Sequence, residues 1–141
     1  MTVLALDFGE RRIGVAASDP DGHIARPLTV IERASRAEDM ERIGELLRSR
    51  HVEKVVVGLP LNLDGSAGPS ARRARRFAAA LRKALELPVD LWDERLTTAE
   101  AERALLASDR SRQRRKEVRD AVAASLILQS YLDAQRKSAE T

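Results

Sequence analysis

The sequence predicts an α/β fold, a mixed sheet with helices on its faces. Short apolar runs near the amino terminus follow one another as strands, whereas later runs alternate with amphipathic helical segments. The 141 residues are about one domain long, which is enough to bury a core, and the absence of cysteine excludes a disulfide framework. Neither an internal repeat nor a domain boundary interrupts the chain, so we expect one domain over residues 1–141.

The first three strands are expected to be antiparallel neighbours joined by tight turns. They cover residues 3–8, 12–18 and 27–32. The first two would pair as a hairpin across Gly9 and Glu10, and the DPDG sequence at 19–22 is strong turn chemistry. Gly14 lies inside the second strand, where a glycine fits either the close approach of a backbone or ligand, or simple packing.

Helices and strands alternate in the rest of the chain. The expected helices cover residues 35–50, 70–87, 97–108 and 117–135, and the expected strands residues 54–58 and 89–92. Two helices begin with a capping box, Ser35 with Glu38 and Thr97 with Glu100. A loop rich in Gly, Pro and Asn spans residues 59–69, and the polar stretch 109–116 is expected to be a linker.

Positive charge is unevenly distributed, although the net charge is only +3. Six cations and no acid lie between residues 65 and 85: Arg72, Arg73, Arg75, Arg76, Arg82 and Lys83. A second cluster contains Arg110, Arg112, Arg114, Arg115, Lys116 and Arg119. Such segregation favours a polyanionic partner, because neutralised phosphates release counterions, although a solvated arginine-rich surface would give the same pattern. Four aromatic residues are too few for a module that binds single strands by base stacking.

Two carboxylates stand where strands end. Strand alternation places Asp7 on one face with Val3 and Ala5, and α/β sheets bind ligands at the carboxyl ends of their strands. A turn-capping aspartate before Gly9 is the alternative. Glu94 follows the strand at 89–92, where a surface salt bridge would be the ordinary interpretation.

A third carboxylate, Asp120, lies within a predicted helix. Its spacing places it on one face with Ala124, Ile127 and Tyr131. Burying an ionised carboxylate costs several kcal/mol unless a cation pairs with it. That cation is either a metal ion or a basic side chain such as Lys116.

Together these three carboxylates suit oxygen-ligated Mg²⁺ or Mn²⁺. Two such ions, about 3.5–4 Å apart, activate water and stabilise the leaving oxygen of a phosphodiester. Without metal the carboxylates would repel one another, and at least one would hold a proton. The two histidines, His23 and His51, fall in expected loops and are interpreted as surface residues.

Four ordered segments resemble the YqgF/RuvX family of Holliday-junction resolvases, also described as nucleases that mature the 5′ end of pre-16S rRNA. The segments are residues 4–16, 58–65, 93–98 and 116–124. The resemblance covers nearly the full length. It implies a ribonuclease H-like fold with a five-stranded mixed sheet, three antiparallel strands first, and helices on both faces. Arg119 departs from the family, which is expected to carry an apolar residue before the aspartate.

The resemblance also implies roles for individual residues. Asp7, Glu94 and Asp120 would be the catalytic metal ligands. The residues expected to contact substrate are Arg12, Asn62, Gly65, Arg72, Arg95, Thr98 and Lys116. Arg95 and Thr98 would line the site, whereas Lys116 and the loop at 62–65 would approach the phosphate backbone.

The resulting hypothesis is a cytoplasmic, metal-dependent endonuclease with two Mg²⁺ or Mn²⁺ ions that acts in 5′-end maturation of pre-16S rRNA. The alternatives are a Holliday-junction resolvase and a non-catalytic nucleic-acid or ribosome-binding factor. A sugar-kinase-like phosphotransferase would need two domains around a nucleotide cleft. The expected partners are nucleic acid and the ribosomal particle, with no membrane, in a monomer or homodimer. The sequence does not decide between RNA and DNA.

Overall fold

The computed structural model describes residues 1–97 and 112–140, with side chains for all of these except 112–118 and 140. Five strands form one sheet in the order β3-β2-β1-β4-β5. Their bounds are Thr2–Phe8 for β1, Arg12–Ser18 for β2, Ala25–Glu32 for β3, Val52–Leu59 for β4 and Val89–Asp93 for β5. Every strand that the sequence predicts is present.

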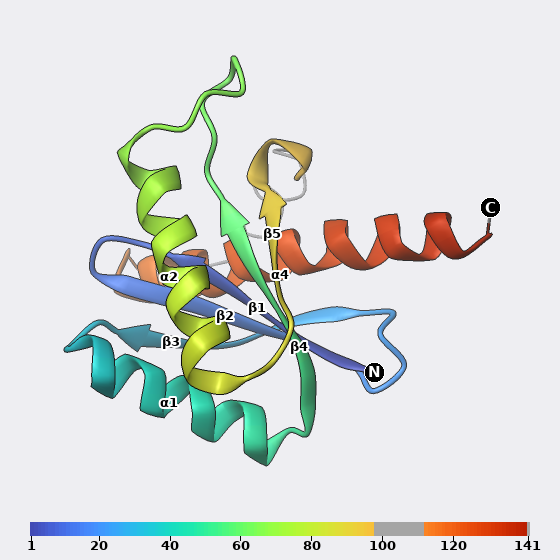
Figure 1. The fold of residues 1–141 in the computed structure, drawn as a ribbon, viewed down its shortest axis with the longest axis horizontal. Coiled ribbons are helices and arrows are strands. Elements are labelled where there is room, and N and C mark those ends of the chain that lie inside the picture. Colours follow the sequence, from blue (N-terminus) through green and yellow to red (C-terminus); the bar gives the residue numbers. More distant parts are fainter. Residues whose placement is uncertain (98–111, 141) are drawn as a thin grey trace.

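The pairing directions give the sheet one functional end. β2 is antiparallel to both β1 and β3, whereas β4 is parallel to both β1 and β5. The carboxyl ends of β1, β4 and β5 therefore meet at one end of the sheet, which we call the carboxyl edge (Figure 1). The predicted mixed sheet with three antiparallel strands first is confirmed.

Two helices pack on one face of the sheet. These are α1, Arg36–Ser49, and α2, Pro69–Leu85 (Figure 1). Ser35 caps α1 as predicted, because its side chain accepts a hydrogen bond from the Glu38 amide at 3.1 Å. Phe77 of α2 is fully buried in the core on this face. The helix ends two residues earlier than predicted, since Glu86 adopts a left-handed conformation with φ of 52°.

The opposite face is covered by α4, Arg112–Glu140. Its apolar stripe packs on small and β-branched side chains of the central strands, a cluster that includes Val3, Ala5, Ala16, Val56, Ala124, Ile127 and Tyr131. The prediction that residues 112–116 belong to a linker is wrong, because they are helical. Arginine, lysine, glutamine and glutamate all favour helix, and neither Gly nor Pro interrupts them. The expected helix at 97–108 lies outside the described residues, apart from Thr97.

A polar cluster fixes α4 to the β4–β5 side of the sheet. Asp90 accepts a hydrogen bond from the Tyr131 hydroxyl at 2.8 Å and lies 2.8 Å from the Lys54 ammonium. The Lys54 hydrogen bond is the main reason that the pKa of Asp90 is lowered from its usual value. The Trp92 ring packs edge-on against Tyr131. These contacts hold α4 in register with the strand that leads to Glu94.

Among the described residues, no helix has both the length and the hydropathy that crossing a bilayer requires.

Candidate active site

Asp7 lies at the carboxyl edge between two glycines of the neighbouring strands. Its antiparallel partner in β2 is Gly14. On the other side, β1 pairs with β4 as far as Leu6 with Val57, so the same register places Gly58 beside Asp7. Asp7 shares the α4 face of the sheet with Val3 and Ala5, both of which pack against that helix. The sheet therefore carries no side chain on either side of this carboxylate.

Helix α4 packs directly on the sheet at Gly14. The residue of α4 that lies over this glycine is Asp120, the third carboxylate. A Cβ added to Gly14 would lie 1.9 Å from the carbonyl oxygen of Asp120 and 2.4 Å from its carbonyl carbon. Only a glycine lets the helix backbone approach so closely. Of the two interpretations that the sequence allows for Gly14, the close approach of a backbone is confirmed.

The remaining carboxylate, that of Glu94, lies next to Gly58. A Cβ at this position would lie 3.2 Å from both the Cγ and the carboxyl carbon of Glu94, and 2.6 Å from Cδ1 of Ile127. Glu94 follows β5 in a short 3₁₀ helix, η1, Glu94–Leu96. Its side chain thus lies over β4 on the face of the sheet that α4 covers. Asp7, Glu94 and Asp120 thus come from three separate segments at the carboxyl edge: Asp7 pairs with Gly14, the Asp120 backbone contacts Gly14, and the Glu94 side chain contacts Gly58. Among the described residues, the acidic group whose ligand atoms all lie within 4.8 Å of one another is a different one, in the turn between β2 and β3.

The surroundings of Asp120 raise the pKa of its carboxyl group. Burial raises the pKa of Asp120, and the nearby charges of Arg12 and Arg119 lower it without cancelling the effect of burial. Arg119 itself is exposed, so its departure from the family pattern leaves the packed face of α4 unchanged. The alternative in which Lys116 neutralises Asp120 is not tested, because the Lys116 side chain lies outside the described part.

This donor set fits a hard divalent cation. Three carboxylates offer only oxygen ligands, the choice of Mg²⁺ and Mn²⁺. The missing side chains at Gly14 and Gly58 let Asp120 and Glu94 approach the sheet on either side of Asp7, and a cation would favour the ionised form of Asp120 that burial disfavours.

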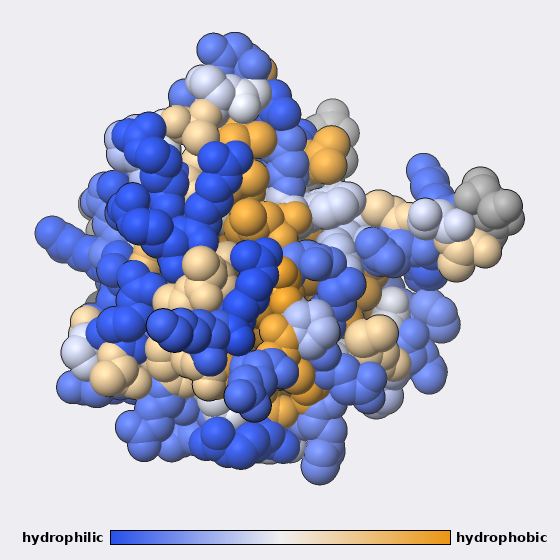
Figure 2. Space-filling model, in the orientation of Figure 1, coloured by the Kyte–Doolittle hydropathy of each residue, from blue (hydrophilic) through white to orange (hydrophobic). Residues whose placement is uncertain are grey.

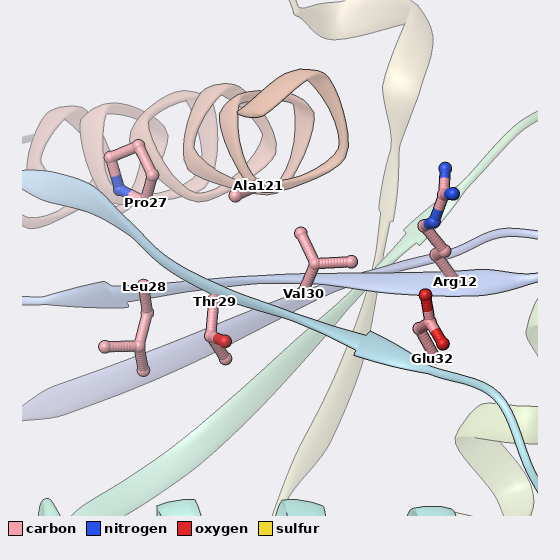
Figure 3. Close-up of a pocket in the computed structure, with 7 residues that line it drawn as sticks. All are labelled: Arg12, Pro27, Leu28, Thr29, Val30, Glu32 and Ala121. Atoms are coloured by element: carbon pink, nitrogen blue, oxygen red, sulfur yellow. The ribbon is translucent and has the colours of Figure 1, made fainter. Parts of the chain in front are cut away.

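Arg12, which the sequence predicts near substrate, lies close enough to Asp120 for its charge to lower the pKa of that carboxyl. It begins β2 opposite Glu32 of β3. Both line a cavity of about 410 Å³ under the amino-terminal half of α4, with Arg12 and Glu32 at one end and Ala121 above (Figure 3). Arg12 also borders a polar hollow of about 530 Å³ with Glu10, Arg11, Glu32, Arg33 and Ala34.

Arg33 holds the turn that follows Asp7, a role that the sequence analysis missed. Its Nη1 donates hydrogen bonds to the carbonyl oxygens of Gly9 at 3.0 Å and Glu10 at 2.8 Å. Its guanidinium lies 4.3 Å from the centre of the Phe8 ring, which stacks in turn on Phe77. No motif marks this contact, because it joins residues more than twenty positions apart.

The residues expected at the phosphate backbone in the loop after β4 have mainly structural contacts. Asn62 donates a hydrogen bond to the Ser66 hydroxyl at 2.9 Å, and Gly65 supplies a left-handed turn with φ of 89°. Arg95 binds both carboxylate oxygens of Asp93 and donates to the carbonyl oxygen of Leu63 at 3.2 Å. The Arg95 hydrogen bond lowers the pKa of Asp93, which stays a paired anion beside Glu94.

The remaining predicted residues are only partly placed. Arg72 is exposed near the start of α2 and donates to the carbonyl oxygen of Ala67 at 3.0 Å. Lys116 belongs to α4, one turn before Asp120, and its side chain lies outside the described part. Thr98 lies outside the described residues. The contacts of these residues with substrate stay predictions.

A second acidic group lies at the opposite end of the sheet. Asp19, Asp21 and His23, in the turn between β2 and β3, have ligand atoms within 4.8 Å of one another. Asp19 accepts hydrogen bonds from the backbone amides of His23 at 2.7 Å and Ile24 at 2.9 Å. These bonds shape the turn, as its sequence predicts. Both His23 and His51 are exposed, as predicted.

Comparison with known proteins identifies the family of the chain. A family model described as "RuvX: Holliday junction resolvase" matches residues 1–134. A relative from Pelotomaculum thermopropionicum is 55% identical over 136 residues, covering 96% of this chain and 88% of the relative, and one from Syntrophomonas wolfei is 50% identical, covering 94% of each. Both are named "Putative pre-16S rRNA nuclease".

The fold also matches a solved structure. The Thermus thermophilus RuvC protein, in complex with a Holliday junction substrate, superposes with a TM-score of 0.62 at 17% identity, covering 96% of each chain. At that identity the likeness concerns the fold alone, and it confirms the ribonuclease H-like architecture that the resemblance implies. The family match over residues 1–134 and the two close relatives identify the sequence group as well: the chain belongs to the RuvX family.

Proposed function

We propose that the protein is a metal-dependent endonuclease that hydrolyses phosphodiester bonds in the 5′-end maturation of pre-16S rRNA. The observation that carries the proposal is the placement of Asp7, Glu94 and Asp120 at the same edge of the sheet, Asp7 and Asp120 at Gly14 and Glu94 at Gly58. The names of the close relatives support the substrate, and the RuvC-like fold supports metal dependence. The nucleic acid is the partner, and the site lies in a single domain spanning the chain.

Each part of the site has a task in this proposal. The carboxylates of Asp7, Glu94 and Asp120 would hold Mg²⁺ or Mn²⁺, which when bound would supply an activated water and stabilisation of the leaving oxygen. Arg33 fixes the turn after Asp7 through the Gly9 and Glu10 carbonyls, so that the first carboxylate keeps its place. Arg12, next to Asp120, offers a positive charge to the phosphate that enters the site.

The basic surface of α2 extends this site along the substrate. Arg72, Arg75 and Arg76 are exposed on the first two turns of the helix, which begins at the carboxyl edge. Figure 2 shows hydrophilic side chains gathered over α2. Guanidinium groups bind phosphates through paired hydrogen bonds, so this surface suits the backbone of a nucleic acid that passes over the carboxylates.

Charge reversal tests this path. We expect Arg75→Glu together with Arg76→Glu to weaken binding of a precursor-rRNA fragment and to flatten its salt dependence. Each lost phosphate contact removes about 0.7–0.9 from the slope of log affinity against log salt concentration. Arg48→Glu, at the far end of α1, is the matched control and should keep the original slope. An unchanged slope in the α2 variant would mean that this surface faces away from the nucleic acid.

The proposal is tested by a side-by-side cleavage assay. The purified protein is given a precursor-rRNA fragment and a four-way DNA junction, with Mg²⁺, with Mn²⁺ and with a chelator. The junction is included because the family model carries the description of a Holliday junction resolvase. We expect cleavage of the rRNA precursor that requires both metal and Asp7, with Asp7→Asn as the inactive control.

Other outcomes separate the competing functions. Cleavage of the junction in preference to the precursor would replace the proposed substrate and keep the mechanism. A protein that binds both nucleic acids, cleaves neither, and supports growth equally well with Asp7→Asn would be a non-catalytic binding factor.

A further inference from the structure

The loop after β4 presents one apolar side chain to solvent. The side chain of Leu63 is 95% exposed, whereas the other large exposed hydrophobic residues, Met1, Ile24 and Leu96, are 51–59% exposed. Figure 1 shows this loop extending beyond the strands, between the end of β4 and the start of α2. Leu63 thus lies at the carboxyl edge, the end of the sheet that carries the three carboxylates.

The turn that carries Leu63 is closed by its own hydrogen bonds. Asp64 accepts from the amide and the hydroxyl of Ser66, at 2.9 and 2.6 Å. The backbones of Asn62 and Ser66 also bond, at 2.9 Å, and Gly65 donates to the Asn62 carbonyl oxygen at 2.8 Å. The polar side chains of the loop therefore contact one another. The leucine is the side chain that the turn holds out.

A guanidinium group ties this turn to the active site. Arg95 donates to the carbonyl oxygen of Leu63 and binds Asp93, the residue before Glu94. A Cβ added to Gly65 would lie 3.5 Å from Nη1 of the same guanidinium. The backbone of Leu63 is thereby held at a fixed place relative to the carboxylate of Glu94.

The surroundings of the loop indicate which class of partner Leu63 contacts. Single exposed apolar residues are common on protein surfaces and usually need no explanation. Here the side chain is held out by a braced turn whose own carboxylate, Asp64, binds Ser66. Arg95 on one flank is paired with Asp93, whereas Arg72 on the other flank is exposed at the start of α2. Apolar side chains, leucine among them, are what several nucleic-acid-binding proteins insert as wedges between base steps.

We propose that Leu63 is a wedge that inserts between bases next to the cleaved phosphodiester and so positions the substrate over the carboxylates. The proposal rests on the proposed nuclease function and assigns Asn62, Asp64 and Gly65 to building the turn. Leu63 is accordingly a positioning residue, whereas Asp7 is catalytic. A nucleic acid is favoured over a protein partner because the loop leads into α2, where Arg72, Arg75 and Arg76 are exposed.

The test uses the precursor-rRNA fragment and the DNA junction with 2-aminopurine at the nucleotides that flank the cleaved bond. Ca²⁺ replaces Mg²⁺ in the binding measurements. We expect the full-length protein to raise 2-aminopurine fluorescence at one position, and Leu63→Ala to lose that rise. Binding of Leu63→Ala should weaken about tenfold, the ratio that corresponds to losing most of one leucine's burial. Leu63→Phe should restore both signals, and Ile24→Ala, an exposed residue at the opposite end of the sheet, should leave them unchanged.

The possible failures are distinguishable. Equal fluorescence and equal affinity for wild type and Leu63→Ala would overturn the wedge even if metal-dependent cleavage persists. A fluorescence rise that depends on Leu63 without any cleavage would overturn the nuclease and keep the wedge. Unchanged nucleic-acid binding by Leu63→Ala, together with weakened binding to the precursor ribosomal particle, would show that Leu63 contacts a protein instead.

Discussion

Asp120→Asn is expected to abolish metal-dependent cleavage and leave the fold intact. The change removes the charge of one of three metal ligands, and we expect a loss greater than about 100-fold, the upper end of what changes to the groups around a metal site cost. Rates of cleavage of the precursor-rRNA fragment at saturating Mg²⁺ or Mn²⁺ measure the effect. Asp133→Asn is the matched control, because Asp133 is exposed on the same helix. Undiminished cleavage by Asp120→Asn would exclude this residue from the mechanism.

The same variant has a predictable effect on metal-free stability. Because burial raises the pKa of Asp120 in the folded state, its ionisation destabilises the fold as the pH rises above the ordinary carboxyl pKa of about 4. At pH 7 without metal, the free energy of unfolding of Asp120→Asn should therefore equal or exceed that of wild type. The difference should vanish below about pH 4, where both folded and unfolded chains hold the proton. Urea unfolding at the two pH values measures it.

Gly14→Ala is expected to be severely destabilising and inactive. The added Cβ would overlap the backbone of Asp120, which cannot rotate away as a side chain can, so α4 must move off the sheet. We expect a loss of about 3 kcal/mol or more in the free energy of unfolding, measured by urea denaturation. Cleavage should fall with it even under conditions where the variant is folded, because the movement displaces Asp120 from Asp7.

Gly44→Ala provides the matched control. A Cβ on Gly44 in the middle of α1 would meet the end of the flexible Arg48 side chain at 3.1 Å. Alanine favours helix over glycine by about 1 kcal/mol, so this variant should be as stable as wild type or more stable. Equal stability of Gly14→Ala and wild type would contradict the close contact between α4 and the sheet.

Local patterns in the sequence predict much of this structure, because strand alternation, helical spacing and helix capping depend on residues close together in the chain. Strand alternation gives the face on which Asp7 lies, and helical spacing places Asp120 on the stripe of Ala124 and Ile127. The Ser35 cap is also readable, since it depends on residues within one turn. The resemblance to a family adds the ligand roles, which local patterns leave open.

Contacts between distant segments were not predictable in the same way. Arg33 acts on the Gly9 carbonyl from the end of another strand, and nothing in its own neighbourhood marks that role. Within the loop after β4, Asn62 and Gly65 build the turn that exposes Leu63, and their expected contact with the phosphate backbone stays a prediction. A motif identifies the important loop, but only the fold shows which of its side chains remain exposed.

The central claim is that the carboxyl edge, and not the acidic turn at the opposite end of the sheet, holds the metal. Calorimetric titration with Mn²⁺ of wild type, Asp7→Asn and Asp19→Asn tests it directly. Asparagine at position 19 keeps an oxygen that can accept the His23 and Ile24 amides, so that variant should preserve the turn. The account predicts that Asp7→Asn loses Mn²⁺ binding and Asp19→Asn retains it. Retention by Asp7→Asn with loss in Asp19→Asn would contradict the account.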